Sequence, residues 1–124
     1  MKKVKRNMPH VCFLCGKNGT ADPLDKHHIF GGARRGKSEQ YGLYVYLCHD
    51  HCHENGKHAA HRDPETAQLL HEYGQRLAMR EQGWNTQEFI YEFGKNYLDP
   101  DEEPEYTPAV LDFFAVINEA PLPF

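Results

Sequence analysis

The 124-residue sequence lacks the features of several protein classes. No apolar run approaches the roughly 20 residues of a membrane-spanning helix, and no signal-peptide pattern is present. Internal repeats are absent too, as are the recognition helix or repeated fingers of proteins that read DNA bases. Hydrophobic residues make up 40% of the chain, which indicates one small domain with a modest core. We expect a soluble, cytoplasmic protein.

Cysteine is scarce, with four residues, and in a reducing compartment these indicate metal binding rather than disulfides. They form two pairs, Cys12-x2-Cys15 and Cys48-x3-Cys52. Zinc prefers four tetrahedral ligands, often thiolates supplied in pairs separated by roughly two to four residues. The sequence therefore predicts a structural Zn²⁺ site that staples a small core. His51 is a rival fourth ligand, because Cys48-x2-His51 is an equally allowed spacing.

The net charge of −4 is unevenly distributed. Residues 1–37 carry nine Lys or Arg and two Asp, whereas residues 38–124 carry five basic and sixteen acidic side chains. The positive half attracts polyanions, and Arg34, Arg35 and Lys37 are clustered within it. The basic run in residues 1–10 is either a solvated tail or an arm that binds DNA.

Four segments follow from the pattern. Residues 1–10 form a mobile basic arm, 11–63 hold the cysteines and most histidines, 64–98 form a helical extension, and 99–124 form an acidic linker and tail. Short strands are expected at Val11–Leu14 and Leu43–Leu47, an arginine-containing loop after Gly32, and a short helix from His49.

Capping residues predict two helices in the extension. Asp63 and Pro64 begin the first, which ends at Gly83. Asn85 and Glu88 form a capping box for the second, with Trp84 packed on Phe89 as a hydrophobic staple. Aromatic residues on these helices are expected in the core. A third short helix is expected at Val110–Ile117.

The histidines carry the chemical argument. Adjacent side chains on a strand point to opposite sides, so in the pair His27-His28 one ring can bind a metal while the other stays free as a base. His53 follows Cys52 directly and is placed to complete the metal site, and His61 returns to it only if the intervening segment loops back. The other histidines receive no functional interpretation: His10, His49, His58 and His71.

The runs Leu24-Asp-Lys-His-His-Ile-Phe-Gly-Gly32 and Tyr41–Cys48, with Cys52-His53, resemble the zinc-containing HNH endonucleases. Phage-encoded members with a His-His-Ile/Val-x-Gly opening are the most similar in pattern. The resemblance covers residues 11–63, and Gln75–Leu98 resembles the helical extension of that subgroup. It implies an α+β protein with a ββα-metal (His-Me finger) core, a treble-clef-like zinc knuckle and C-terminal helices.

The resemblance also implies the roles of the histidines. His28 corresponds to the general base, His27 to the first metal ligand and His53 to the final His of the motif, with His61 as a third ligand. The middle Asn of the family pattern is missing, because Gly42 and Leu43 occupy that neighbourhood. The second cysteine pair encloses three residues where many members have two, so Cys52 and His51 both remain candidates.

The resemblance predicts hydrolysis of DNA phosphodiester bonds with low sequence specificity. One divalent ion (Mg²⁺, Mn²⁺, Ni²⁺ or Zn²⁺) would assist, and Arg34 or Arg35 would clamp the phosphate. Two alternatives stay open: a non-catalytic zinc module that binds DNA, and a zinc-stapled protein-interaction module. The C-terminal Pro-Phe tail resembles the tip of bacterial single-stranded-DNA-binding proteins, which predicts a protein partner, unless Phe124 folds back on the domain.

Overall fold

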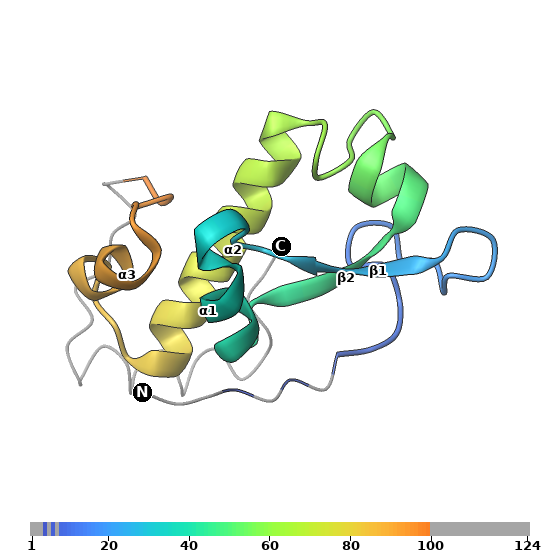
Figure 1. Ribbon diagram of the computed structural model, residues 1–124. Coiled ribbons are helices and arrows are strands. Elements are labelled where there is room, and N and C mark those ends of the chain that lie inside the picture. The colour runs from blue at the N-terminus through green and yellow to red at the C-terminus, as the bar shows by residue number, and fades with distance from the viewer. Residues whose placement is uncertain (1–3, 5, 7, 100–124) are drawn as a thin grey trace.

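The computed structural model describes residues 4, 6 and 8–99 (Figure 1). Two antiparallel strands, β1 (Leu24–His28) and β2 (Tyr44–Cys48), form a hairpin-like sheet. The long helix α2 (Pro64–Gln82) runs beside this sheet, and α3 (Thr86–Phe93) lies near the C-terminal end of α2 (Figure 1). The expected mixture of helix and strand is confirmed. The expected helix Val110–Ile117 and the Pro-Phe tail lie outside the described residues.

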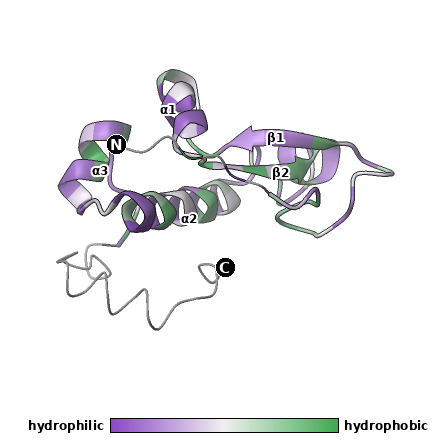
Figure 2. Ribbon diagram, turned by 90° about the horizontal axis from the view of Figure 1, so that it is seen from below, coloured by the Kyte–Doolittle hydropathy of each residue, from purple (hydrophilic) through white to green (hydrophobic). Residues whose placement is uncertain are grey.

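The register of the sheet separates the two histidines of the pair. His27 is opposite Val45 and Asp25 is opposite Leu47, so these four side chains share one face. His28 is opposite Tyr44 and lies on the other face. Figure 2 shows that β2 is largely hydrophobic and β1 largely hydrophilic. β1 therefore carries the polar side chains of the sheet, and β2 supplies side chains that are buried in the core.

The strand predicted at Val11–Leu14 is wrong, because residues 11–14 contain no strand and residues 13–15 form a turn. The backbone N–H of Gly16 donates to the Cys12 carbonyl, and the Cys12 N–H donates to the Lys17 carbonyl, both at 2.8 Å. In an extended strand Cys12 and Cys15 would point to opposite faces. The turn instead brings their sulfur atoms to the same side, as a shared ligand site requires.

The arginine-containing loop expected after Gly32 is also wrong. Gly32–Arg34 forms the 3₁₀ turn η1, and Arg35–Gln40 forms the helix α1. The side chain of Ser38 is fully buried and bonds at both ends of this segment, since it accepts from the Phe30 N–H and donates to the Leu43 carbonyl. These bonds hold the segment in a compact helical path.

The helix boundaries predicted from capping residues are confirmed. Asp63 accepts a hydrogen bond from the Glu65 N–H at the start of α2, and Gly83 ends the helix with φ 71°. Asn85 and Glu88 form both bonds of the capping box of α3. The rings of Trp84 pack on Tyr41 and Phe93, and Trp84 and Phe89 lie in the same buried core cluster.

The core contains the aromatic residues expected there. The ring of Phe30 packs against Phe89, Phe93 and Tyr97, with centroid distances of 5.6, 4.7 and 5.5 Å. Phe30 follows the histidine pair by two residues, so the core cluster fixes the end of β1. Among the described residues no helix combines the length and apolar character needed to cross a membrane.

The described part of the N-terminal arm lies against the fold, which differs from the mobile arm expected. The guanidinium of Arg6 donates to the Gly42 carbonyl at 2.8 Å and pairs with Glu81 on α2 at 2.5 Å. The Tyr44 hydroxyl donates to the Arg6 carbonyl. Because its charge is already paired with Glu81, Arg6 is a poor candidate for a DNA contact.

Candidate functional site

The four cysteines meet in one place, which we call the four-cysteine group: Cys12, Cys15, Cys48 and Cys52. Their sulfur atoms all lie within 4.8 Å of one another, and three of the four side chains are buried. Cys48 ends β2, and Cys52 lies on the following π-helical turn η2 (His49–Glu54). Residues four apart on a helical turn lie on one face, so Cys48 and Cys52 face the same point. The group could hold a metal ion, as the spacing predicted.

The structure places Cys52, rather than His51, in this group. His51 is exposed, and its Nδ1 atom lies 3.4 Å from the Cys52 sulfur, outside the cluster. Of the two alternatives left open by the spacing, the geometry of η2 therefore favours Cys52.

The electrostatics of the four-cysteine group favour a bound cation. Burial raises the pKa of the Cys12 thiol, but hydrogen bonds from the backbone of Cys15, Cys48 and Leu14 outweigh it and lower the pKa to about 7. Burial and the neighbouring sulfur atoms raise the pKa of Cys48 to about 12. One thiolate thus opposes the ionisation of the next. A divalent ion removes this conflict, because its charge stabilises several thiolates together.

Three imidazole rings converge beside the sheet, and we call them the three-histidine group: His27, His53 and His61. The ring centroids are 5.1 Å apart for His27 and His53, 5.2 Å for His27 and His61, and 4.6 Å for His53 and His61. The Nε2 atoms of His53 and His61 are 3.0 Å apart. Neutral imidazole nitrogens at such distances are a donor set that fits a transition-metal ion.

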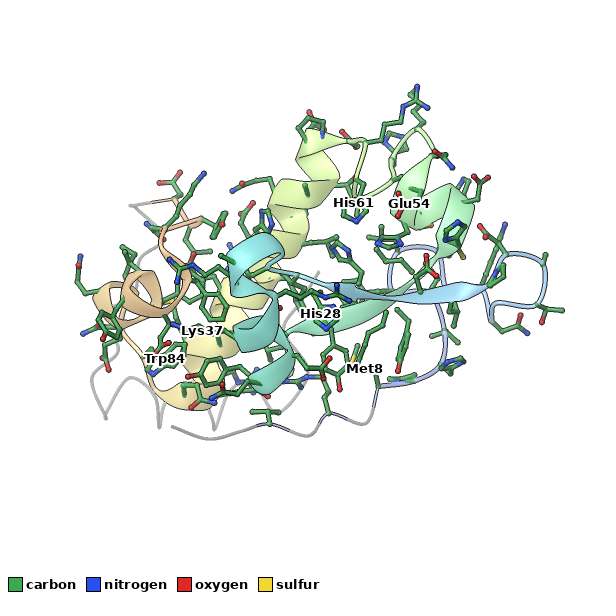
Figure 3. All side chains as sticks on the ribbon, in the orientation of Figure 1. Met8, His28, Lys37, Glu54, His61 and Trp84 are labelled. Carbon is green, nitrogen blue, oxygen red and sulfur yellow. The ribbon has the colours of Figure 1, made fainter. Side chains whose placement is uncertain are left out.

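Backbone hydrogen bonds bring His61 to this group. The His61 N–H donates to the His53 carbonyl at 3.0 Å, and the Ala60 N–H donates to the Cys52 carbonyl at 2.8 Å. The segment between η2 and α2 therefore loops back, which is the condition that the sequence set for His61. Figure 3 shows His61 on the side of the hairpin where Glu54 of η2 also lies.

Burial keeps the ring of His27 neutral. Desolvation, together with the neighbouring rings of His53 and His61, lowers the pKa of His27 from 6.5 to about 3. A neutral ring retains a lone pair on one nitrogen, which is the form that binds a metal.

Asp25 orients the ring of His53. Its carboxylate accepts a hydrogen bond from the His53 Nδ1–H at 2.8 Å, so the lone pair lies on Nε2, the nitrogen near His61. A carboxylate in this position is typical of metal-bound histidines. Asp25 was missed in the sequence, although its spacing of two from His27 places both on one face of a strand.

His28 lies on the opposite face and has a carboxylate partner of its own. Its Nε2–H donates to Glu39 on α1 at 2.8 Å, and Lys26 pairs with the same carboxylate at 3.0 Å. Hydrogen bonds from His28 and Lys26 lower the pKa of Glu39. The free acceptor of the ring is then Nδ1. The sequence also did not indicate Glu39, because the position of Glu39 depends on α1, where a loop was predicted.

The two arginines proposed as phosphate clamps have different surroundings. Arg34 donates to the carbonyl of Glu92 at the end of α3, at 3.2 Å. Lys37 pairs with the buried carboxylate of the same Glu92 at 2.8 Å. Arg35 is exposed. Of the three, Arg35 is therefore the residue best placed to meet a ligand from solution.

Comparison with protein-family models, with curated proteins and with solved structures found no match to this chain. The functional argument accordingly depends on the residues and their geometry.

Proposed function

We propose that this protein is a metal-dependent endonuclease of the HNH type that hydrolyses DNA phosphodiester bonds through a ββα-metal core. One observation carries the proposal: the sheet register separates the adjacent histidines. His27 joins the three-histidine group, while His28 pairs with Glu39 on the other face. A hydrolytic metal site needs ligands and a separate base, and this division supplies both from one strand end.

The donor set indicates which metals fit. Three neutral nitrogen ligands suit borderline ions such as Zn²⁺ and Ni²⁺, whereas Mg²⁺ prefers oxygen ligands. When bound, such an ion supplies positive charge that stabilises the reacting phosphate and the leaving oxygen. Asp25 prepares the site by holding His53 in the tautomer whose Nε2 is unprotonated.

The residues on the other face of the sheet, around His28, accept the proton from the attacking water. His28 accepts a proton from water at Nδ1, because Glu39 holds the proton of the ring on Nε2. Lys26 pairs with Glu39 and so limits the movement of the carboxylate. The resulting Lys26–Glu39–His28 chain orients the base without contacting the substrate.

Phosphate binding is assigned to the positive half of the chain, where the arginine Arg35 on α1 is exposed. Contacts of this kind position DNA but do not read its sequence. We therefore propose low sequence specificity and a steep loss of affinity with added salt.

The test is cleavage of supercoiled plasmid with Mg²⁺, Mn²⁺, Ni²⁺ or Zn²⁺ supplied in turn. Wild type should convert the plasmid to nicked or linear forms, and His28→Ala should lose at least about 100-fold in rate, the range for removing a general base. His58→Ala is the matched control, since His58 is an exposed histidine paired with Asp63 at 3.2 Å. It should cleave as wild type does.

Zinc content must be measured for each variant, so that loss of the four-cysteine site is not mistaken for loss of the base. If no protein cleaves with any metal while all of them shift DNA in a gel, the nuclease proposal fails. The chain is then a non-catalytic zinc module that binds DNA.

A further inference from the structure

A second set of ligand atoms lies next to the three-histidine group, and we call it the second group: Asp25, His49 and His53. The Oδ2 atom of Asp25 lies 2.5 Å from Nδ1 of His49 and 2.8 Å from Nδ1 of His53. Glu54 adds a carboxylate oxygen 3.6 Å from the same His53 nitrogen. One imidazole (His49) and two carboxylates (Asp25 and Glu54) therefore lie at the Nδ1 edge of His53.

The local backbone brings these side chains together. His49 and His53 are four residues apart on η2, and Cys48, the residue before η2, is four residues from Cys52, so the turn brings together two pairs of ligands on adjacent sides. The His49 N–H donates to the Pro23 carbonyl at 2.7 Å, which ties the start of η2 to the residue before β1. Asp25, the second residue of β1, then lies within reach of both rings.

The charge and exposure of the second group suit a cation from solution. The His49 and Asp25 side chains are 56% and 32% exposed. With neutral rings, two carboxylates balance the charge of a divalent ion, and mixed nitrogen and oxygen ligands fit Zn²⁺.

His53 belongs to both groups, so the two groups compete for its one lone pair when they bind a metal. A neutral imidazole has a lone pair on one nitrogen only, because the other carries the proton. In the three-histidine group His53 offers Nε2, and in the second group it offers Nδ1. A metal at one position therefore removes a ligand from the other.

We propose that Asp25, His49 and His53 form a second, weaker site for a transition-metal dication, which competes with the three-histidine site for His53. It is the weaker site because two of its side chains are partly exposed and because the ion must displace both hydrogen bonds to Asp25. Excess metal would occupy this second site and bind Nδ1 of His53. The lone pair at Nε2 would then no longer be available, so the three-histidine site would bind its metal more weakly. The inference rests on the proposed function only where it concerns cleavage.

The binding test uses Zn²⁺ as the probe and needs no DNA. Nitrogen NMR of the histidine side chains reports which ring nitrogen binds the metal. In wild type, low zinc should engage Nε2 of His53 and excess zinc should engage Nδ1. In His49→Ala the first step should be unchanged, and the second should need at least about tenfold more zinc, a typical cost of losing a supporting residue.

His58→Ala again serves as the control, because it removes an exposed histidine that also pairs with an aspartate but lies outside both groups. It should show both zinc steps. The proposal is overturned if His53 keeps Nε2 on the metal at every zinc concentration, or if His49→Ala shows the second step at the wild-type concentration.

Cleavage separates this proposal from the proposed function. If both hold, plasmid cleavage by wild type rises and then falls as zinc increases, and His49→Ala shifts the fall to higher zinc. Two NMR steps without cleavage by any variant support the second site and reject the nuclease. Cleavage with a single NMR step supports the nuclease and rejects the second site.

Discussion

At the scale of single residues, Glu39 is the most informative side chain that the sequence did not indicate. It accepts from His28 at 2.8 Å and so selects the tautomer of the proposed base. We predict that Glu39→Gln lowers the rate of cleavage by roughly 10- to 100-fold with little change in KM. The amide of Gln can donate to His28 and so stabilise the wrong tautomer.

The measurement is a single-turnover cleavage rate together with the tautomer of His28 from nitrogen NMR. Glu72→Gln is the control, since Glu72 is a partly exposed glutamate on α2 that pairs with Arg76. Wild-type cleavage by Glu39→Gln would exclude a positioning role for Glu39.

The pKa of His27 leads to a prediction about stability. Its pKa falls from 6.5 to about 3 on folding, so below 6.5 the unfolded chain binds a proton that the folded chain does not. Stability is therefore complete above pH 6.5 and is lost as the pH falls. Between pH 7.5 and 5.5 this linkage should cost wild type about 1.4 kcal/mol of unfolding free energy that His27→Asn does not lose.

Urea unfolding of both proteins at the two pH values, without added divalent metal, measures this difference. Carboxylates and thiolates that titrate in the same range are common to both proteins and cancel in the comparison. An equal loss in the two proteins would show that His27 is not held neutral by burial.

At the scale of elements, the position of β1 depends on how closely α2 approaches it. A Cβ atom at Gly74 would lie 2.7 Å from Cγ2 of Ile29 and 2.9 Å from Cε2 of Phe30. Both side chains are buried and have little room to move. Gly74→Ala should therefore destabilise the fold by about 1–3 kcal/mol, despite the helix propensity of alanine.

Gly36→Ala is the matched comparison, because Gly36 lies on α1 with no atom within 4 Å of its added Cβ. It should stabilise the protein by roughly 0.5–1 kcal/mol through helix propensity alone. Thermal unfolding of the two variants gives the sign directly. A stabilising effect at both positions would contradict the close packing of α2 on the residues after the histidine pair.

The boundaries of α2 and α3 follow from local sequence signals. The starts of α2 and α3 depend on Asp63 and Asn85, whose side chains bond to backbone groups only two or three residues away. The helix α1 has no such cap. It depends on the buried Ser38, which bonds to residues outside the helix, and on the packing of Phe30 against Phe93, which is distant in the sequence. This is why a loop was predicted there.

At the scale of the whole molecule, the four-cysteine group joins the N-terminal turn to the end of β2. In a chain with a core this small, we expect zinc to supply much of the folding free energy. Cys52→Ser should lose the zinc and with it cooperative thermal unfolding. His51→Ala should keep both, because His51 is an exposed neighbour of the group.

Zinc per chain, measured by atomic absorption, and circular dichroism on heating test this prediction. A strong chelator added to wild type should reproduce the Cys52→Ser behaviour. If His51→Ala loses zinc and Cys52→Ser retains it, the fourth ligand has been assigned to the wrong residue.

The sequence by itself determined the groups whose members are close together or have a fixed spacing. The cysteine pairs, the helix caps and the opposite directions of His27 and His28 all depend on local geometry, which spacing alone specifies. The tertiary structure decided which residues form hydrogen bonds and ion pairs with the site residues. The contacts of Asp25 depend on the position of η2 and those of Glu39 on α1, and the bonds of Arg34 and Lys37 to Glu92 span more than 50 residues. Hydrogen bonds act over about 3 Å, so they become visible only once the chain has brought distant residues into contact.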